Sequence, residues 1–253
     1  MSLGHLEHVP EEEIYNGCSN HFYLPHHAVI KESSTTTKLR VVFDGSAKTT
    51  AGISLNDILM VVPTLQPDIF DLLVRFRQYK VGLTADIAKM YRQIGLSSTA
   101  KPFHRIVWRD DPSQEIQHLQ MARVTYGIGS SAYHSIRPLQ EASKLTENKR
   151  VAQSILNDVY VDDFLSGSNR VMEAVELQDD TIKTLDKANM QLRKWVSNEP
   201  KLIERLPSDL RGNEGVNLFE DHATIKTLGI VWEYSSDCFK SLLSQNQSPH
   251  NKT

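Results

Sequence analysis

Residues 155–165 read ILNDVYVDDFL, two short apolar runs around the adjacent carboxylates of Asp162 and Asp163. Side chains alternate between the two faces of a strand, and a turn interrupts that alternation. The pattern therefore predicts two short strands that meet at a tight turn, with both carboxylates at its exposed tip. Two carboxylates this close repel each other, and a bound cation would relieve the repulsion.

Magnesium is the cation that this pair suits best. Hard oxygen ligands favour Mg²⁺, which proteins usually hold with one or two carboxylates together with substrate phosphates. The pair is therefore a candidate binding site for the metal ions that catalyse phosphoryl transfer. Short motifs also arise by chance, so a solvated Asp-Asp turn on the surface is an equally open alternative for these two residues alone.

A third carboxylate lies at the end of another apolar run. Residues 81–87 predict a buried strand that closes on Asp86, and an Asp in that position is poorly tolerated unless it is paired or holds a metal. A helix is expected over 68–79, where Ile69, Leu72, Leu73 and Phe76 share one face. The longest helical pattern covers 171–196, and further strands are expected over 28–31, 39–43, 105–108, 116–123 and 227–232.

The strands expected over 28–31 and 39–43 flank a Ser/Thr-rich loop and predict a β-hairpin. Lys31 and Arg40 lie on its arms, and positive side chains on such a hairpin suit nucleotide phosphates. A solvated hairpin with charged edges is the alternative. Gly127 belongs to a small-residue loop, residues 125–131, which would let the backbone approach a ligand closely.

The composition is that of a soluble globular protein. Hydrophobic residues make up 40% of the 253 residues and charged residues 23%, and the length allows one large domain or two small ones. No apolar run approaches the ~20 residues of a membrane span, and residues 1–10 do not resemble a signal peptide. With two widely separated cysteines, we expect an intracellular, cytoplasmic protein.

Charge is distributed unevenly along the chain. Basic residues outnumber acidic ones over 31–150, whereas acidic residues outnumber basic ones over 151–253. This asymmetry fits a surface that meets polyanions beside an acidic, metal-binding centre. Ordinary variation of surface charge explains it equally well.

Taken together, the ordered motifs resemble the palm of a reverse transcriptase. A strand ending on Asp86 comes first, and a hairpin with Asp162-Asp163 follows later in the chain. Longer strings resemble the polymerases of Bel/Pao-type LTR retrotransposons. These strings are residues 21–32, 38–46, 83–91, 124–127, 160–163 and 226–232. Agreement of several motifs in order is far more specific than any one of them.

The resemblance implies an α+β fold with the fingers and palm of a right-handed polymerase, an antiparallel palm sheet and no thumb. It assigns the fingers and palm to residues 21–240, while the polar composition predicts a loosely packed lead-in (1–20) and a disordered tail (241–253). The implied activity is RNA-directed DNA synthesis, within a longer retrotransposon polyprotein. Expected partners are an RNA or DNA template–primer, deoxynucleoside triphosphates and other polyprotein segments, without a membrane.

The resemblance also implies a metal site. Asp86, Asp162 and Asp163 would hold two Mg²⁺ ions, or Mn²⁺ in their place, for nucleotidyl transfer. Lys194 would give a proton to the leaving pyrophosphate, with a solvated helical lysine as the alternative.

Further residues are implied to contact the nucleotide. Lys31 and Arg40 would grip the triphosphate, and Gly127 would lie beneath the nucleotide. Tyr91 would exclude a ribose 2′-hydroxyl and so favour deoxynucleotides. Ala132 departs from the family pattern, which has proline before Tyr133.

Two other functions remain open at this stage. The chain could be a catalytically idle remnant, or an adopted module that only binds nucleic acid or protein. It could also be an unrelated metal-dependent phosphotransferase that uses the same carboxylates.

Overall fold

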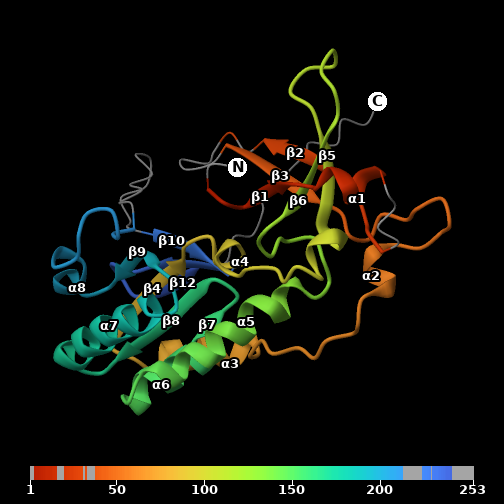
Figure 1. Cartoon of the computed structure of the whole chain (residues 1–253). Helices are drawn as coiled ribbons and strands as arrows, with labels where there is room; N and C mark the ends of the chain where they lie inside the picture. The colour runs from red at the N-terminus through yellow and green to blue at the C-terminus, as the bar shows by residue number, and fades with distance from the viewer. Residues whose placement is uncertain are drawn as a thin grey trace, which may run out of the picture. The chain divides into compact units, whose positions relative to one another are not determined.

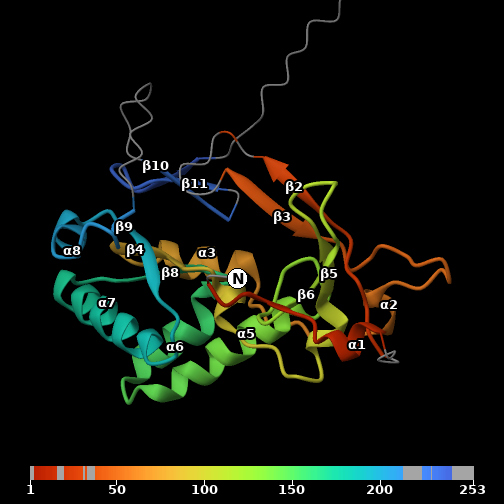
Figure 2. The same cartoon turned by 45° about the horizontal axis from the view of Figure 1, so that its top comes forward.

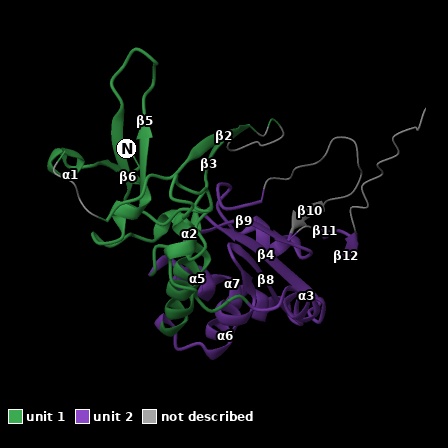
Figure 3. Cartoon of the chain, turned by 90° about the vertical axis from the view of Figure 1, so that its right-hand side faces the viewer, with its two compact units in different colours: residues 1–66, 89–144, 188–190 green, residues 67–88, 145–187, 191–253 purple. Residues whose placement is uncertain are grey.

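The computed structural model describes residues 3–15, 20–30, 32, 38–212, 224–228 and 230–240 (Figure 1). The chain combines helices with antiparallel sheets, which confirms the predicted α+β class. The chain forms two compact units (Figure 3). Unit 1 comprises residues 1–66, 89–144 and 188–190, and unit 2 comprises 67–88, 145–187 and 191–253.

Unit 1 contains a three-stranded antiparallel sheet in the order β1-β6-β5. Strands β2 and β3 form a separate hairpin (Figure 2). Its strands are β1 (Leu6–His8), β2 (His26–Ile30), β3 (Leu39–Phe43), β5 (Arg105–Trp108) and β6 (Gln117–Met121). Its helices are α1 (Glu11–Tyr15), α2 (Leu55–Ile58), α4 (Met90–Gln93), the 3₁₀ turn η1 (Lys101–His104) and α5 (Ser131–Ala142).

The core of unit 1 joins the hairpin to the sheet. Phe43 of β3 and Leu55 of α2 pack in one buried cluster with Leu119 and Met121 of β6. The expectation of a loosely packed lead-in is wrong for residues 6–9, because β1 pairs antiparallel with β6 and Val9 is buried. The polar appearance of this segment concealed the strand, since only part of a three-residue edge strand needs to be apolar.

Unit 2 contains a four-stranded antiparallel sheet in the order β7-β8-β4-β9 and a smaller sheet in the order β10-β11-β12. Its strands are β4 (Val81–Ile87), β7 (Val159–Tyr160), β8 (Asp163–Ser168), β9 (Leu192–Ser197), β10 (Thr224–Thr227), β11 (Ile230–Glu233) and β12 (Cys238–Lys240). Its helices are α3 (Ile69–Arg77), α6 (Lys149–Asn157), α7 (Val171–Asp186) and α8 (Pro200–Glu204). A 3₁₀ turn, η2 (Ser143–Leu145), lies where the chain passes between the units.

Helix α7 packs against β4 and β8 and also against α6 (Figure 1). A second buried cluster, in unit 2, contains Phe76 of α3, Leu165 of β8, Val196 of β9 and Trp232 of β11. The rings of Phe76 and Trp232 meet edge to face with their centroids 5.0 Å apart. The small sheet is thereby anchored on the four-stranded sheet by large apolar side chains.

Helix starts follow side chains that cap free backbone N–H groups. Asp68 accepts a hydrogen bond from the Phe70 N–H at 2.7 Å and begins α3. Asn148 accepts from the N–H of Arg150 at 3.1 Å and begins α6. Each capping residue has an extended backbone and directly precedes the first helical turn. The residue type at these positions therefore predicts where each helix begins.

Several strands match their predicted bounds, and two helix boundaries differ. Strands β3, β4 and β5 cover the predicted ranges 39–43, 81–87 and 105–108. The helix predicted over 171–196 is wrong beyond Asp186, because residues 192–197 form β9. The strand predicted from residue 155 is also wrong at its start, because α6 continues to Asn157 and only Val159–Tyr160 form β7.

The predicted strand over 227–232 is divided between β10 and β11, with Leu228 at a left-handed φ of 52°. Lys31 and the predicted tail over 241–253 lie outside the described residues. In the described part of the chain, helices with the length and apolarity needed to cross a membrane are absent.

Gly82 of β4 provides a test of the packing in unit 2. An alanine Cβ there would lie 2.9 Å from Phe76 Cζ and 3.1 Å from the Trp232 ring. We expect Gly82→Ala to lower the free energy of unfolding by about 1–3 kcal/mol, because two buried rings would have to shift. Urea denaturation of the variant measures this change.

Gly95→Ala is the matched control for this substitution. The nearest atom to its added Cβ would be the Arg123 guanidinium at 3.7 Å, which is an ordinary contact. Equal stabilities of the two variants would show that the packing of Phe76 and Trp232 over Gly82 is not as described.

Candidate catalytic site

The pairing of β4 with β8 brings the predicted aspartates to one end of the four-stranded sheet. Asp86 of β4 lies opposite Asp163 of β8 in the antiparallel register. Asp162 precedes Asp163 in the turn, and its carbonyl accepts a hydrogen bond from the Ile87 N–H at 2.7 Å. The three acidic residues therefore share one small region of unit 2, and each is partly buried.

The turn between β7 and β8 is strained. Val161 adopts a left-handed φ of 54°, and a β-branched residue rarely takes this conformation because its side chain crowds the backbone. Strained backbone of this kind persists only where surrounding structure enforces it, and it is common at functional sites. Here the pairing of Tyr160 with Asp163 closes the turn on both sides.

Lys194 of β9 contacts this site directly. Its Nζ donates to Asp86 Oδ2 at 2.8 Å, with the lysine side chain 54% exposed and the aspartate side chain 28% exposed. The register of β9 against β4 shifts between Thr84 and Asp86, and Lys194 has a left-handed φ of 54°. The alternative of a solvated helical lysine is wrong, because this residue lies on a strand.

A local signal in the sequence could have revealed the end of helix α7. Asn189 follows the helix with a φ of 56°, and asparagine is among the residues that end helices in the left-handed conformation. The apolar residues beyond it fit a helical stripe as well as a strand, so periodicity alone extended the helix too far.

Electrostatics at the turn disfavour the ionised form of Asp162. Burial raises the pKa of the Asp162 carboxyl, and the negative charge of Asp86 raises it further. Its own backbone N–H and the ammonium of Lys194 act in the opposite direction. The two carboxylates are therefore close enough to repel each other across the site, and positive charge would stabilise the pair.

The donor set has the chemistry that Mg²⁺ prefers, since it consists of carboxylate oxygens near one another. As the side chains lie, however, no group of three or more His, Cys, Asp or Glu within the described residues is arranged to hold a metal ion. Asp86 is instead occupied by the ammonium of Lys194. The repulsion between Asp86 and Asp162 fits a cation, whereas ligation by all three aspartates remains a prediction.

Asp158 is a buried acid that the sequence did not single out. Its Oδ1 accepts from Arg75 Nε at 3.2 Å and its Oδ2 accepts from the Ser166 hydroxyl at 2.8 Å. Burial raises its pKa, while Ser166 and Arg75 lower it. These contacts connect the residue before β7 to α3 and β8, so Asp158 helps to hold the β7–β8 hairpin in position. Its place within the apolar run 155–165 was the signal available.

Arg40, Tyr91 and Gly127 all belong to unit 1. Arg40 is exposed on β3, opposite Val29 of β2, and Tyr91 is half-buried on α4. Gly127 follows Tyr126, whose hydroxyl donates to the Val41 carbonyl at 2.6 Å. The structure thus connects the loop over 125–131 to β3, and the predicted roles of these residues with a nucleotide remain predictions.

Gly127 occupies a position that no other residue could take without rearrangement. Its φ is +86°, and an added Cβ would lie 1.9 Å from the Phe43 carbonyl oxygen. The Gly127 carbonyl also accepts a hydrogen bond from the Gly45 N–H at 2.9 Å. The backbone at Gly127 therefore closely approaches β3 and the residues that follow it, whereas the predicted approach to a ligand remains a prediction.

Solved structures similar to this chain include foamy viral enzymes. A foamy viral protease-reverse transcriptase in complex with double-stranded DNA matches 92% of this chain with a TM-score of 0.61 and 14% sequence identity. A prototype foamy virus protease-reverse transcriptase mutant matches 94% with a TM-score of 0.59 and 14% identity. The foamy viral enzyme with an RNA/DNA hybrid matches 91% with a TM-score of 0.56 and 13% identity.

These similarities establish a reverse-transcriptase-like fold for the chain. The matches span 32%, 24% and 24% of the lengths of the three foamy viral chains. No protein-family profile matches the sequence, and no curated protein does.

Replacing Asp162 should change how stability depends on pH. The pKa of the Asp162 carboxyl is higher in the folded chain than in the unfolded chain, so the folded chain binds this proton more tightly. The free energy of unfolding therefore falls as the pH rises from the ordinary Asp pKa of about 3.9 through the raised pKa of the folded chain. We therefore expect Asp162→Asn to unfold at a higher temperature than the unchanged chain at pH 7. Thermal melts across pH 3–8 should show this difference shrinking in acid.

Asp209→Asn, on an exposed turn of unit 2, is the control for neutralising a carboxylate. A difference between Asp162→Asn and the unchanged chain that stays constant from pH 3 to pH 8 would contradict the raised pKa of Asp162.

Proposed function

We propose that this chain provides the fingers and palm of an RNA-directed DNA polymerase from a Bel/Pao-type retrotransposon polyprotein. The observation that carries the proposal is the Asp86–Asp163 register, with Asp162 beside it in a strained turn, on a reverse-transcriptase-like fold. The motif strings of the sequence support the Bel/Pao assignment. The proposal places the chain inside a cell, with other polyprotein segments as partners.

Asp86, Asp162 and Asp163 are the residues that would hold Mg²⁺. When bound, the metal would supply activation of a primer 3′-hydroxyl and neutralisation of the departing pyrophosphate. Lys194 holds a proton on Nζ, 2.8 Å from Asp86 Oδ2, and in this proposal it donates that proton to pyrophosphate. Asp158 keeps the hairpin in place through Arg75 and Ser166.

Unit 1 would contribute the nucleotide contacts. Arg40 is exposed, so its guanidinium is available to a triphosphate, and the half-buried Tyr91 would act on the sugar. Foamy viral enzymes of the same fold have been solved with double-stranded DNA and with an RNA/DNA hybrid. These complexes support a template–primer as the partner proposed for this chain, with deoxynucleoside triphosphates as its substrates.

A second candidate function is a module that binds nucleic acid or protein without chemistry. The observation that favours it is the ion pair between Lys194 and Asp86, which occupies one predicted metal ligand. In the described residues, moreover, no ready cluster of three metal-binding side chains exists. Measurement of metal binding and of primer extension separates the two functions.

The polymerase proposal predicts primer extension that depends on the aspartates. The chain, supplied with an RNA template, a DNA primer and Mg²⁺ or Mn²⁺, should add deoxynucleotides. Asp163→Asn should reduce the extension rate by at least about a hundredfold, because a metal ligand would be lost. Extension is followed on denaturing gels, and Mn²⁺ binding is followed separately by electron paramagnetic resonance.

Asp209→Asn again serves as the control and should extend primers at the unchanged rate. A folded chain that binds a template–primer but neither binds Mn²⁺ nor extends the primer would support the non-catalytic module instead.

Tyr91 is proposed to select the sugar. Tyr91→Ala should lower the preference for deoxynucleotides over ribonucleotides by roughly tenfold or more, because the space for a 2′-hydroxyl would open. Competition between the two nucleotide classes measures the ratio, and Tyr133→Ala in α5 is the matched aromatic control. An unchanged ratio in Tyr91→Ala would make this residue a packing residue only.

A further inference from the structure

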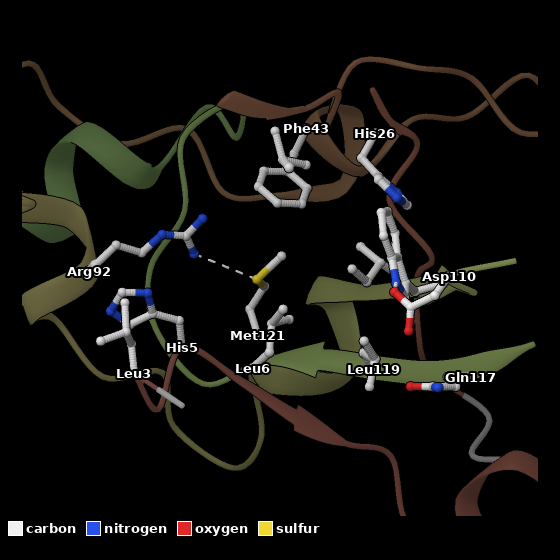
Figure 4. A pocket seen from close by; sticks show the side chains of 13 residues that line it. Leu3, His5, Leu6, His26, Phe43, Arg92, Asp110, Gln117, Leu119 and Met121 are labelled. Carbon is white, nitrogen blue, oxygen red and sulfur yellow. Dashed lines mark hydrogen bonds between the residues drawn. The ribbon is translucent and has the colours of Figure 1, made fainter. Parts of the chain in front are cut away.

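Unit 1 contains a pocket of ≈ 450 Å³ that the proposed polymerase function does not use (Figure 4). Its walls come from β1, the hairpin of β2 and β3, α4, and the sheet strands β5 and β6. The volume lies within the range of sites for small molecules. Arg40, Tyr91 and Gly127 are not among the lining residues, so the pocket differs from the expected nucleotide contacts.

One end of the pocket presents a cation without a countercharge. The Arg92 guanidinium lies over the rings of Phe43 and Tyr126, at 5.7 Å and 5.6 Å from their centroids. Its Nη1 donates to Met121 Sδ at 3.6 Å, and a thioether is a weak acceptor. Among the described residues, carboxylates lie beyond ion-pair distance of Arg92.

The surroundings of Arg92 add to this positive charge. Burial lowers the pKa of Arg92, whereas its electrostatic interaction and side-chain hydrogen bond with Tyr126 raise it. His5 lines the same end, and its pKa is lowered by burial and by the charges of Arg92, Lys89 and Arg123. A partly desolvated guanidinium among other cations favours an anion, which would restore the missing countercharge.

The other end of the pocket offers acceptors and flat rings. Figure 4 shows Asp110 and Gln117 across the pocket from Arg92 and His5. Asp110 Oδ1 accepts from Trp108 Nε1 at 2.9 Å, and Trp108 remains 42% exposed. The Trp108 ring lies 6.0 Å from the ring of His26, which completes an aromatic wall. Between the two ends the lining is mainly apolar, including Leu119 and Met121.

We propose that this pocket binds a nucleoside monophosphate whose base carries an exocyclic amine. The phosphate would accept paired hydrogen bonds from Arg92, because the planar guanidinium matches phosphate geometry. The base would lie against Trp108, since indole rings and bases stack favourably. Its amine would donate to Asp110, as base amines do to carboxylates. Both polar ends of the pocket and its apolar middle are then used by one ligand.

Adenosine 5′-monophosphate and uridine 5′-monophosphate are the probes that test this assignment. Trp195 and Trp232 are fully buried in unit 2, so a change in tryptophan fluorescence on binding reports on Trp108. We expect saturable quenching by the adenine nucleotide and weaker binding of the uracil nucleotide, which has no exocyclic amine. Isothermal titration calorimetry of the full chain gives both dissociation constants and the stoichiometry.

Arg92→Met should weaken binding of the adenine nucleotide by roughly tenfold or more, because hydrogen bonds to a charged group are lost. Arg137→Met on α5 is the matched control, since Arg137 is exposed and pairs with Glu141 on the same helix. Undiminished binding by a folded Arg92→Met variant would overturn the proposal, as would a lack of binding by the unchanged chain at millimolar nucleotide.

Asp110→Asn tests the end of the pocket that would bind the base. Asp110 is exposed, so this variant should fold and can refute the proposal even if Arg92→Met does not fold. An asparagine amide can also donate to the uracil carbonyl, so the preference for the adenine nucleotide should shrink several-fold. Asp111→Asn is the control, since Asp111 bonds Ser113 and does not line the pocket. A preference that survives Asp110→Asn unchanged would remove Asp110 from the site and overturn the assignment of an amine-bearing base.

Discussion

The antiparallel pairing of β4 with β8 concentrates negative charge at one end of the sheet, and the rest of unit 2 accommodates that charge. Asp86 and Asp163 face each other in the ladder, and Asp162 is next to them in the turn. Carboxylates at the ends of buried strands are costly to desolvate together. Lys194 offsets part of this cost by pairing with Asp86, although its strand must bulge to bring the ammonium there.

Backbone strain gathers around the same charges. Val161 in the turn and Lys194 on β9 both adopt left-handed φ values, of 54° each, and neither is a glycine. Such conformations cost on the order of 1–3 kcal/mol each and need support from the surrounding packing. Buried contacts supply that support, since Leu165 of β8 and Val196 of β9 belong to the same apolar cluster. The packing of the buried cluster thus stabilises the strained backbone at Val161 and Lys194 and keeps the neighbouring carboxylates close together.

The sequence predicted those parts of the fold that local chemistry determines. Strand β4 could be recognised because its apolar run is continuous and ends on a single acid, and α3 because Asp68 caps an amphipathic stripe. Strand β9 could not, since its apolar residues also suit a helix and only pairing with β4 decides between the two. The ion pair of Lys194 with Asp86 joins segments far apart in the chain and was therefore beyond local patterns. The positive end of the pocket was missed for the same reason, because Arg92 meets Phe43 and Tyr126 only after folding.

The glycine that packs against β3 bears on how the history of this chain should be interpreted. The backbone at Gly127 lies so close to the Phe43 carbonyl that any side chain would force the two segments apart. Selection for a folded unit 1 alone would therefore retain glycine there, whether or not the chain ever handled a nucleotide. Persistence of Gly127 across divergent copies would record only folding. Persistence of the Asp162 carboxylate, which burial and the charge of Asp86 make unfavourable, would record chemistry.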